Sequence, residues 1–346
     1  MTIAAAPSAP SATAVPLLQV DDLGVRFSSR DLDISVVNGV SFSLDRGQVL
    51  CLLGESGSGK SVTLRALMRL FPETARLSGR IVIDGVDVLA LPPHEMRKVR
   101  GGLVSMIFQE PMTAFDPVFT IGTQIAETIV HHDGVSYRDA GRRALELLEL
   151  VQVPSAKRRL AAYPHELSGG LRQRAMIALA LACRPKLLLA DEPTTALDAT
   201  VQIQVLLLLR ELQRELGMAT IFVTHDLGVA CEIADRVAVM YAGRFVETGA
   251  IADIMDHPSH PYTQGLLRST VHGGMRGEAL DPIPGAPPDL ADLPPGCSFA
   301  PRCAAAREVC VSGPPDLFPS GPGQAARCLQ YQPGLRFDAT PALKAS

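Results

Sequence analysis

Short apolar runs separated by polar turns fill the first part of the chain and predict β structure. The predicted strands are Leu17–Val20, Val36–Leu44 and Gln48–Leu53, then Gly79–Val88 as a strand or hairpin and Leu103–Phe108 as a buried strand. The N-terminal part of the chain is therefore expected to be rich in β-sheet.

From Gln109 to Ser168 the periodicity changes to that of helices. Ile121–His131 and Tyr137–Leu150 carry apolar residues at spacings of three and four. This stretch predicts a helical insertion between two parts of an α/β core.

After the insertion, apolar strands return and alternate with a helix. The expected elements are a strand at Lys186–Glu192, a helix at Val201–Leu216, a strand at Thr220–Thr224, and a hairpin of Arg236–Tyr241 with Arg244–Thr248 around Ala242-Gly243. Their order favours an α/β fold.

The apolar run Val49–Leu53 leads directly into Gly54-Glu55-Ser56-Gly57-Ser58-Gly59-Lys60-Ser61, and a helical pattern follows through Leu70. This order of strand, loop and helix is the context of a phosphate-binding P-loop. The glycines let backbone N–H groups curl around an anion, and the helix N-terminus adds partial positive charge. Lys60 is expected to reach the β- and γ-phosphates and Ser61 to bind Mg²⁺. The alternative is a Gly/Ser-rich turn before an ordinary helix.

Nucleotide binding is thus predicted for the phosphate loop, Gly54–Ser61, together with Val62. Phe27, upstream of the loop, is a candidate for stacking on a nucleotide base. An aromatic ring that fills space beside the sheet is the alternative interpretation of Phe27.

The strand Lys186–Glu192 ends in two carboxylates. In P-loop enzymes an Asp at this position holds Mg²⁺, which is the role expected of Asp191. Glu192 is expected to orient and deprotonate a water. A solvated turn is the alternative for these two carboxylates. His225, at the end of a later strand, is a candidate site residue only because that strand follows the acidic one.

Composition narrows the class of protein. The chain has 346 residues, is 47% hydrophobic and carries a net charge of -4 with a pI of about 6.1. These values allow a sizeable core and argue against a broad nucleic-acid footprint. The longest apolar run, Ala175–Cys183, is too short to span a bilayer. Residues 1–16 are rich in Ala, Pro, Ser and Thr, and we expect a disordered lead in a cytosolic protein.

The seven cysteines fall into two groups. Cys51, Cys183 and Cys231 lie singly in apolar segments and are predicted to be small core residues. The other group has the spacing Cys297-x5-Cys303-x6-Cys310-x17-Cys328 and lacks the Cys-x2-Cys pairs of zinc ribbons. Four thiolates suit a tetrahedral zinc or an iron–sulfur cluster, and free thiols are the alternative. We refer to these four residues as the cysteine set.

The segment Leu167-Ser168-Gly169-Gly170-Leu171-Arg172-Gln173-Arg174 decides the family. With the phosphate loop, Gln109, Asp191-Glu192, Thr195-Ala196-Leu197-Asp198 and His225, it resembles the nucleotide-binding subunit of ABC transporters over roughly residues 17–250. The resemblance implies an α/β fold: a P-loop NTPase (RecA-like) core, an antiparallel β subdomain and an inserted helical signature subdomain at about residues 110–180. Leu171 departs from the usual Gln, as is common in peptide importers.

The resemblance also implies roles for individual residues. Two subunits meet head to tail, and the signature residues Leu167, Ser168, Gly169 and Gly170 of each close on the ATP of the other. It implies that Gln109 serves the Mg²⁺ and water region and senses the membrane partner. It further implies that Glu192 is the general base, that Asp198 communicates across the dimer and that His225 lies at the γ-phosphate.

Within the family, the chain is most similar to the ATPases of dipeptide and oligopeptide importers. The segments that carry this similarity are Phe108–Pro117, Ala190–Thr200, Thr224–Val229, Met240–Arg244, His260–Thr263 and Pro295–Cys303. The resemblance implies an ATP-hydrolysing subunit for peptide import and a [4Fe-4S] cluster on Cys297, Cys303, Cys310 and Cys328. It divides the chain into the lead 1–16, a nucleotide-binding domain 17–270 and a C-terminal extension 271–346.

The partners implied are a second ATPase subunit, commonly non-identical, two transmembrane permease subunits and an extracytoplasmic solute-binding protein. The expected location is the cytoplasmic face of the cell membrane, without nucleic acid. An importer of nickel complexes, glutathione or another small solute is an alternative. An ABC ATPase that acts on DNA or ribosomes is a more distant one, because the chain has one cassette and no heptad run.

Overall fold

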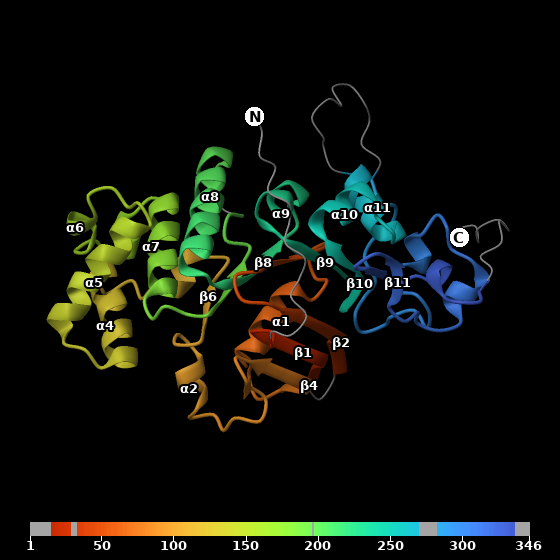
Figure 1. The fold of residues 1–346 in the computed structure, drawn as a ribbon, viewed down its shortest axis with the longest axis horizontal. Coiled ribbons are helices and arrows are strands. Elements are labelled where there is room, and N and C mark those ends of the chain that lie inside the picture. The colour runs from red at the N-terminus through yellow and green to blue at the C-terminus, as the bar shows by residue number, and fades with distance from the viewer. Residues whose placement is uncertain (1–14, 29–32, 196, 270–281, 336–346) are drawn as a thin grey trace, which may run out of the picture.

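The structure is a computed structural model that describes residues 15–28, 33–195, 197–269 and 282–335. Two sheets and a separate group of helices form the molecule (Figure 1). The larger sheet has the strand order β11-β12-β10-β9-β3-β8-β7-β6, and the smaller has the order β2-β1-β4-β5. The predicted lead lies almost wholly outside the described residues.

The centre of the larger sheet is parallel and almost fully buried. It consists of β6 (Val104–Ile107), β7 (Leu187–Asp191), β8 (Ala219–Thr224), β3 (Val49–Leu53) and β9 (Arg236–Tyr241). Strands covered on both faces are mostly apolar, as these are, and every residue of the five strands is buried except Arg236. Because Leu53 pairs with Thr224 and Asp191 pairs with Val223, the segments that follow β3, β7 and β8 emerge side by side.

The smaller sheet is antiparallel and covers one side of the phosphate loop helix. Its strands are β2 (Asp33–Leu44), β1 (Leu18–Ser28), β4 (Ala75–Ile83) and β5 (Val86–Asp87). Its inner face shares a core with α1 (Lys60–Leu67) and α2 (Met96–Val99). The stretch predicted as a strand or hairpin, Gly79–Val88, forms a hairpin in the structure, and the first strand is longer than predicted.

The predicted helical insertion is also present, at the left of Figure 1. It contains α3 (Pro111–Ala114), α4 (Ile121–Asp133), α5 (Tyr137–Leu150), α6 (Ala156–Arg159), a 3₁₀ turn at Pro164–Glu166 and α7 (Gly169–Leu181), and α8 (Ala199–Leu216) packs beside it.

Local sequence explains these helices. The N-cap hydroxyls of Thr120 and Ser136 accept hydrogen bonds from the first turns of α4 and α5. Ile121, Ile125 and Ile129 recur every fourth residue along α4 and form its buried stripe.

The C-terminal part continues the large sheet instead of forming a separate body. It comprises α9 (Leu227–Ile233), β10 (Arg244–Ala250), α10 (Ile251–Asp256), α11 (Pro261–Arg268), 3₁₀ turns at Ala300–Arg302, Glu308–Val311 and Leu329–Tyr331, β11 (Phe318–Gly321) and β12 (Gln324–Ala326). Glu247 of β10 pairs with Ala326 of β12. Tyr241, Tyr262 and Phe299 pack together in a core shared by cassette and extension.

The cysteine predictions hold only in part. Cys51 is buried and Cys183 is half-buried, but Cys231 is exposed, so its assignment to the core is wrong. The short helix α9 buries Leu227, Ala230 and Ile233 at helical spacing, which leaves Cys231 on the other side. In the described parts of the chain, no helix is both long and apolar enough to cross a bilayer.

Candidate functional site

The phosphate loop follows β3 and depends on its glycines. Gly54 and Gly59 have φ angles of 153° and 105°. A Cβ on Gly54 would lie 2.2 Å from Met240 O, and one on Gly59 would lie 2.9 Å from Val36 O. Both positions therefore require glycine for backbone conformation and for space.

Lys60 is drawn into the loop. Its Nζ donates hydrogen bonds to Gly54 O and Glu55 O, both at 2.8 Å, and the residue is only 5% exposed. Burial lowers the pKa of Lys60, and the nearby carboxylates of Glu192 and Asp191 act against this shift. An anionic phosphate would supply the counter-charge that this buried ammonium needs.

Of the three residues predicted to serve Mg²⁺, Ser61 and Asp191 are in direct contact, whereas Gln109 contacts Glu192. Ser61 Oγ donates a 2.7 Å hydrogen bond to Asp191 Oδ1, and Asp191 is 2% exposed. Burial raises the pKa of Asp191, while the Ser61 bond opposes the rise. A hydroxyl and a buried carboxylate beside a phosphate loop are the oxygen donors that suit Mg²⁺.

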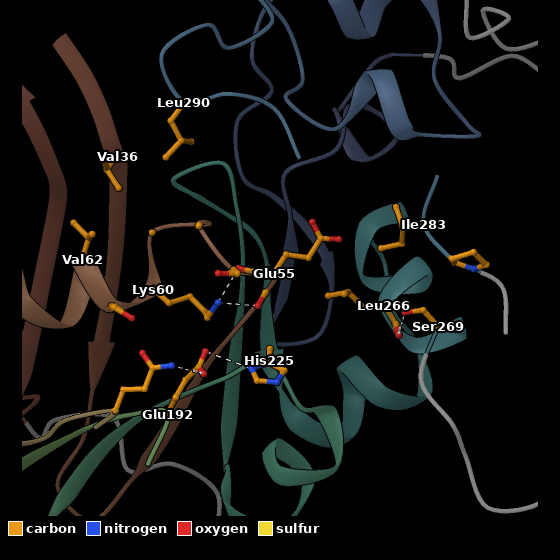
Figure 2. A pocket seen from close by; sticks show the side chains of 17 residues that line it. Val36, Glu55, Lys60, Val62, Glu192, His225, Leu266, Ser269, Ile283 and Leu290 are labelled. Atoms are coloured by element: carbon orange, nitrogen blue, oxygen red, sulfur yellow. Dashed lines mark hydrogen bonds and ion pairs between the residues drawn. The ribbon is translucent and has the colours of Figure 1, made fainter. Parts of the chain in front are cut away.

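Glu192 is the centre of the polar contacts at the end of β7. Its carboxylate accepts from Thr195 Oγ1 at 2.8 Å and from Gln109 Nε2 at 3.3 Å. His225 Nδ1 lies 3.4 Å from the other carboxylate oxygen (Figure 2). Glu192 also has a φ of 44°, a left-handed conformation uncommon outside glycine, and such strain is often found at functional sites.

Lys60, Ser61 and Glu192 line one cavity of ≈ 860 Å³, whereas Asp191 lies behind Ser61 and is not part of its lining. All predicted nucleotide-binding residues line it except Phe27 and Ser58, and Gln109 and His225 line it as well. Ser58 is 5% exposed. Figure 2 shows Val36 and Val62 at the left of the cavity, Leu266 and Ile283 at the right, and Leu290 at the top, nearer to Val36.

Phe27 packs edge-on against Phe71, with ring centroids 5.6 Å apart. The contact supports the space-filling alternative for Phe27. On this side of the cavity the wall is Val36, from β2. No periodicity in the sequence distinguished Val36 from other strand residues.

The C-terminal wall was not anticipated either. Leu266 and Ser269, at the end of α11, line the cavity together with Pro282, Ile283 and Leu290 of the extension. The Pro-rich composition of this stretch indicated irregular structure, but gave no sign that it faces the phosphate loop.

The signature residues lie apart from this cavity. Leu167 is buried, whereas Ser168 is exposed and is the N-cap residue of α7, with no hydrogen bond from its own hydroxyl to the helix. Gly170 packs so closely on Val201 of α8 that a Cβ would lie 2.8 Å from Val201 Cγ1. Asp198 caps α8 by accepting a 3.0 Å bond from Val201 N. The exposed end of α7 therefore faces outward from the helical insertion.

The cysteine set lies around one small cavity of ≈ 20 Å³, beside His260 and Phe299. Burial raises the pKa of Cys303 to about 11 and that of Cys328 to about 12. Within the described residues, no group of three or more His, Cys, Asp or Glu side chains is arranged to hold a metal ion. The present spacing of the thiols therefore does not support the predicted cluster.

Comparisons with known proteins identify the family of this chain. The family described as ABC transporter matches residues 37–195, and the one described as oligopeptide/dipeptide transporter, C-terminal region, matches residues 246–310. A Brucella melitensis protein named "Putative peptide import ATP-binding protein" is 49% identical over 92% of this chain and 98% of its own length. The oligopeptide transport ATP-binding protein OppD of Escherichia coli is 48% identical over 91% of this chain and 93% of its own.

Solved structures show the same fold. The dimeric, ADP- and phosphate-bound post-hydrolysis state of the ATP-binding cassette MJ0796 is 28% identical and covers 68% of this chain and 98% of its own, with a TM-score of 0.61. CbiO1 of Clostridium perfringens is 26% identical, covers 70% and 91%, and has a TM-score of 0.60.

The fold and the site define an ATPase of the ABC type, and the predicted fold class is confirmed. The chain belongs to the ABC transporter family, and within it to the branch that carries the oligopeptide/dipeptide transporter C-terminal region.

Proposed function

We propose that this chain is the ATP-hydrolysing subunit that energises import of dipeptides or oligopeptides through a membrane permease. The observation that carries this proposal is the similarity to OppD, which spans both the cassette and the C-terminal region. The cavity at the phosphate loop supplies the matching chemistry.

The residues around the cavity divide the work of hydrolysis. The phosphate loop and Lys60 bind the phosphates, and Ser61 with Asp191 would hold Mg²⁺, which offsets phosphate charge. Glu192 is the general base for the attacking water. Its contacts with Gln109 and His225 fix the direction of its carboxylate. This side of the cavity also leads directly into α3, where we place the contact with a permease helix.

A second subunit completes the site. Ser168 and the N-terminus of α7 form an anion-binding element that is exposed and lies away from the chain's own phosphate loop. In a head-to-tail dimer this element faces the ATP of the partner. We propose a non-identical ATPase partner, two permease subunits and a solute-binding protein, with this chain on the cytoplasmic face of the membrane.

For the cysteine set we propose a [4Fe-4S] cluster with a structural or regulatory role outside ATP hydrolysis. What supports the proposal is the donor type, since four thiols border one cavity. The cavity has room for about one water, and the described arrangement of the thiols does not form a metal site. The raised pKa of Cys297 and Cys303 means that bare thiols stay protonated, so binding would release protons.

The test is purification of the intact complex in mild detergent, followed by identification of its subunits and bound ligand by mass spectrometry. Peptides on the solute-binding subunit, and peptide-stimulated ATP hydrolysis, are expected. A nickel complex or glutathione in their place would contradict peptide import and leave the ATPase assignment intact. A purified complex that contains no permease subunit would contradict the proposed role in transport.

A further inference from the structure

Arg302 of the C-terminal extension forms a two-point ion pair with Glu55 of the phosphate loop. Arg302 Nη1 lies 2.9 Å from Glu55 Oε2, and Arg302 Nη2 lies 3.2 Å from Glu55 Oε1, across 247 residues of sequence. The two parallel bonds form the fork that gives arginine–carboxylate pairs their directionality. The arginine side chain is 7% exposed and that of Glu55 is 27% exposed, so water screens this pair less than a surface pair.

The guanidinium is held in place on its other sides. Its Nε donates to Pro284 O at 2.9 Å, and Nη1 also donates to Tyr241 Oη at 3.3 Å. Its carbon lies 5.8 Å from the ring centre of Tyr241 and 6.0 Å from that of Phe299. Arg302 ends the 3₁₀ turn that lies between Cys297 and Cys303, so the cysteine-bearing segment carries this fixed group.

Glu55 is held through its main chain as well. Its backbone N–H donates to Tyr262 Oη at 3.0 Å, and its carbonyl accepts from Lys60 Nζ. Tyr262 lies on α11, is fully buried and packs on Tyr241 with ring centroids 4.6 Å apart. The backbone N–H and the carboxylate of Glu55 are therefore both held by side chains that follow β10 in sequence, those of Tyr262 and Arg302.

The position of Glu55 makes its ion pair with Arg302 relevant to ligand binding. Glu55 lines the nucleotide cavity, within the loop that cradles phosphates. An unpaired carboxylate there would repel a polyanionic nucleotide and could turn toward Lys60. The arginine cancels that charge and points the carboxylate away from the loop centre.

We propose that Arg302 is a positioning residue of the nucleotide site, through which the cysteine-bearing extension neutralises and fixes Glu55 and so sets affinity for the phosphates of ATP. This rests on the assignment of the cavity to ATP, but not on the identity of the transported solute.

The test is a double-mutant cycle on the full chain, with the Kd of a fluorescent Mg–ATP analogue as the readout. Arg302→Gln is expected to raise Kd about tenfold, equivalent to about 1.4 kcal/mol. Introduced into a Glu55→Gln chain, the same substitution is expected to change Kd by less than about twofold, because no carboxylate remains to be unpaired. A general loosening of the fold would instead cost affinity equally in both backgrounds.

Arg327 provides a matched control. It also precedes a cysteine of the set, but among the described residues its side chain donates to backbone carbonyls, those of Phe245 and Pro315, at 2.9 and 2.8 Å. Arg327→Gln should lower the melting temperature and leave Kd within about twofold of wild type. If Arg302→Gln does not fold, Arg302→Lys, which keeps the charge and loses the fork, should raise Kd about threefold.

A wild-type Kd in Arg302→Gln or, where that variant does not fold, in Arg302→Lys, would overturn the proposal. A penalty that persists in the Glu55→Gln background, or an equal penalty from Arg327→Gln, would also overturn it. If the wild-type chain itself bound no nucleotide, the assignment of the cavity would fail first. Binding with unchanged affinity in the Arg302 variants would leave that assignment standing.

Discussion

Ser61 Oγ and Asp191 Oδ1 are hydrogen-bonded at 2.7 Å although 130 residues separate them in sequence. The hydroxyl belongs to the first turn of α1, and the carboxylate ends β7. Strand β8 lies between β3 and β7, so the pair spans the middle of the parallel sheet. A divalent cation in this position would join the phosphate loop to the strand that leads into Glu192, the proposed general base.

Lys60→Ala should weaken nucleotide binding and abolish turnover. The ammonium makes charge-assisted bonds that phosphate oxygens would take over, and loss of one or two such bonds corresponds to about 10- to 100-fold in Kd. Titration with a fluorescent ATP analogue and a phosphate-release assay measure both effects. Lys157→Ala, in the surface helix α6, is the control and should match wild type. Unchanged affinity in Lys60→Ala would refute the phosphate role.

Glu192→Gln should bind ATP yet hydrolyse it about 10²- to 10⁴-fold more slowly, the range for loss of general-base catalysis. The amide keeps the size of the side chain but cannot accept the proton of water. The variant is expected to accumulate as a closed dimer with ATP, visible by size-exclusion chromatography. Glu211→Gln, an exposed carboxylate on α8, is the matched control. Full turnover in Glu192→Gln would exclude this residue as the base.

Ser168→Arg should damage the partner's ATP site and spare its own. In the proposed head-to-tail dimer the exposed N-terminus of α7 faces the partner's ATP, and a bulky side chain there would block that contact. Mixed dimers with one Ser168→Arg chain, in which only one phosphate loop is intact, separate the two sites. We expect the rate of ATP hydrolysis to fall at least about tenfold when the intact phosphate loop faces the mutant signature, on the scale of the loss of a single stabilising donor. Loss confined to the mutant's own site would be inconsistent with a head-to-tail dimer.

His260 should make the fold acid-sensitive. It is 1% exposed, its Nδ1 accepts from Tyr262 N at 3.0 Å, and burial lowers its pKa to about 3. Because the unfolded residue titrates near pH 6.5, the unfolded state takes up the proton first, and stability falls as pH drops from about 6.5 toward 3. The loss is up to about 1.4 kcal/mol per pH unit, or about 2 kcal/mol at pH 5.

His260→Asn can still cap α11 and has no proton to gain, so its stability should fall less between pH 7 and 5. Denaturant unfolding of both chains at several pH values measures the difference. Burial raises the pKa of Glu247, which favours the folded state as pH falls, and this opposing contribution is common to both chains. Parallel pH profiles would show that His260 is not buried in its neutral form.

Protein purified without oxygen should contain iron and a broad visible absorption band if the cysteine set holds a cluster. Cys303→Ser should lose both signals, whereas Cys231→Ser, which changes an exposed cysteine of α9 outside the set, should retain them. In Cys303→Ser, the rate of ATP hydrolysis by the isolated chain should fall by a smaller factor than the iron content does. Wild-type protein without iron or visible absorption would reject the cluster.

Sequence patterns by themselves determined the elements that local physics controls. Short apolar runs bounded by turns and apolar residues at helical spacing placed most strands and helices within a few residues, because burial dictates those patterns. The phosphate loop was readable for the same reason: only glycine tolerates the backbone of Gly54 and Gly59. Asp191 and Glu192 were identifiable because they end an apolar strand.

Tertiary structure decided which distant groups meet. Nothing local to Arg302 indicates a partner 247 residues away, and nothing local to Val36 marks it as a wall of the nucleotide cavity. Phe27 turned toward Phe71, and Cys231 fell on the exposed side of α9, because packing among neighbouring elements fixes side-chain direction. The chain thus encodes its phosphate loop locally. The ion pair between Arg302 of the extension and Glu55 of that loop forms only when the folded sheet brings the two segments together.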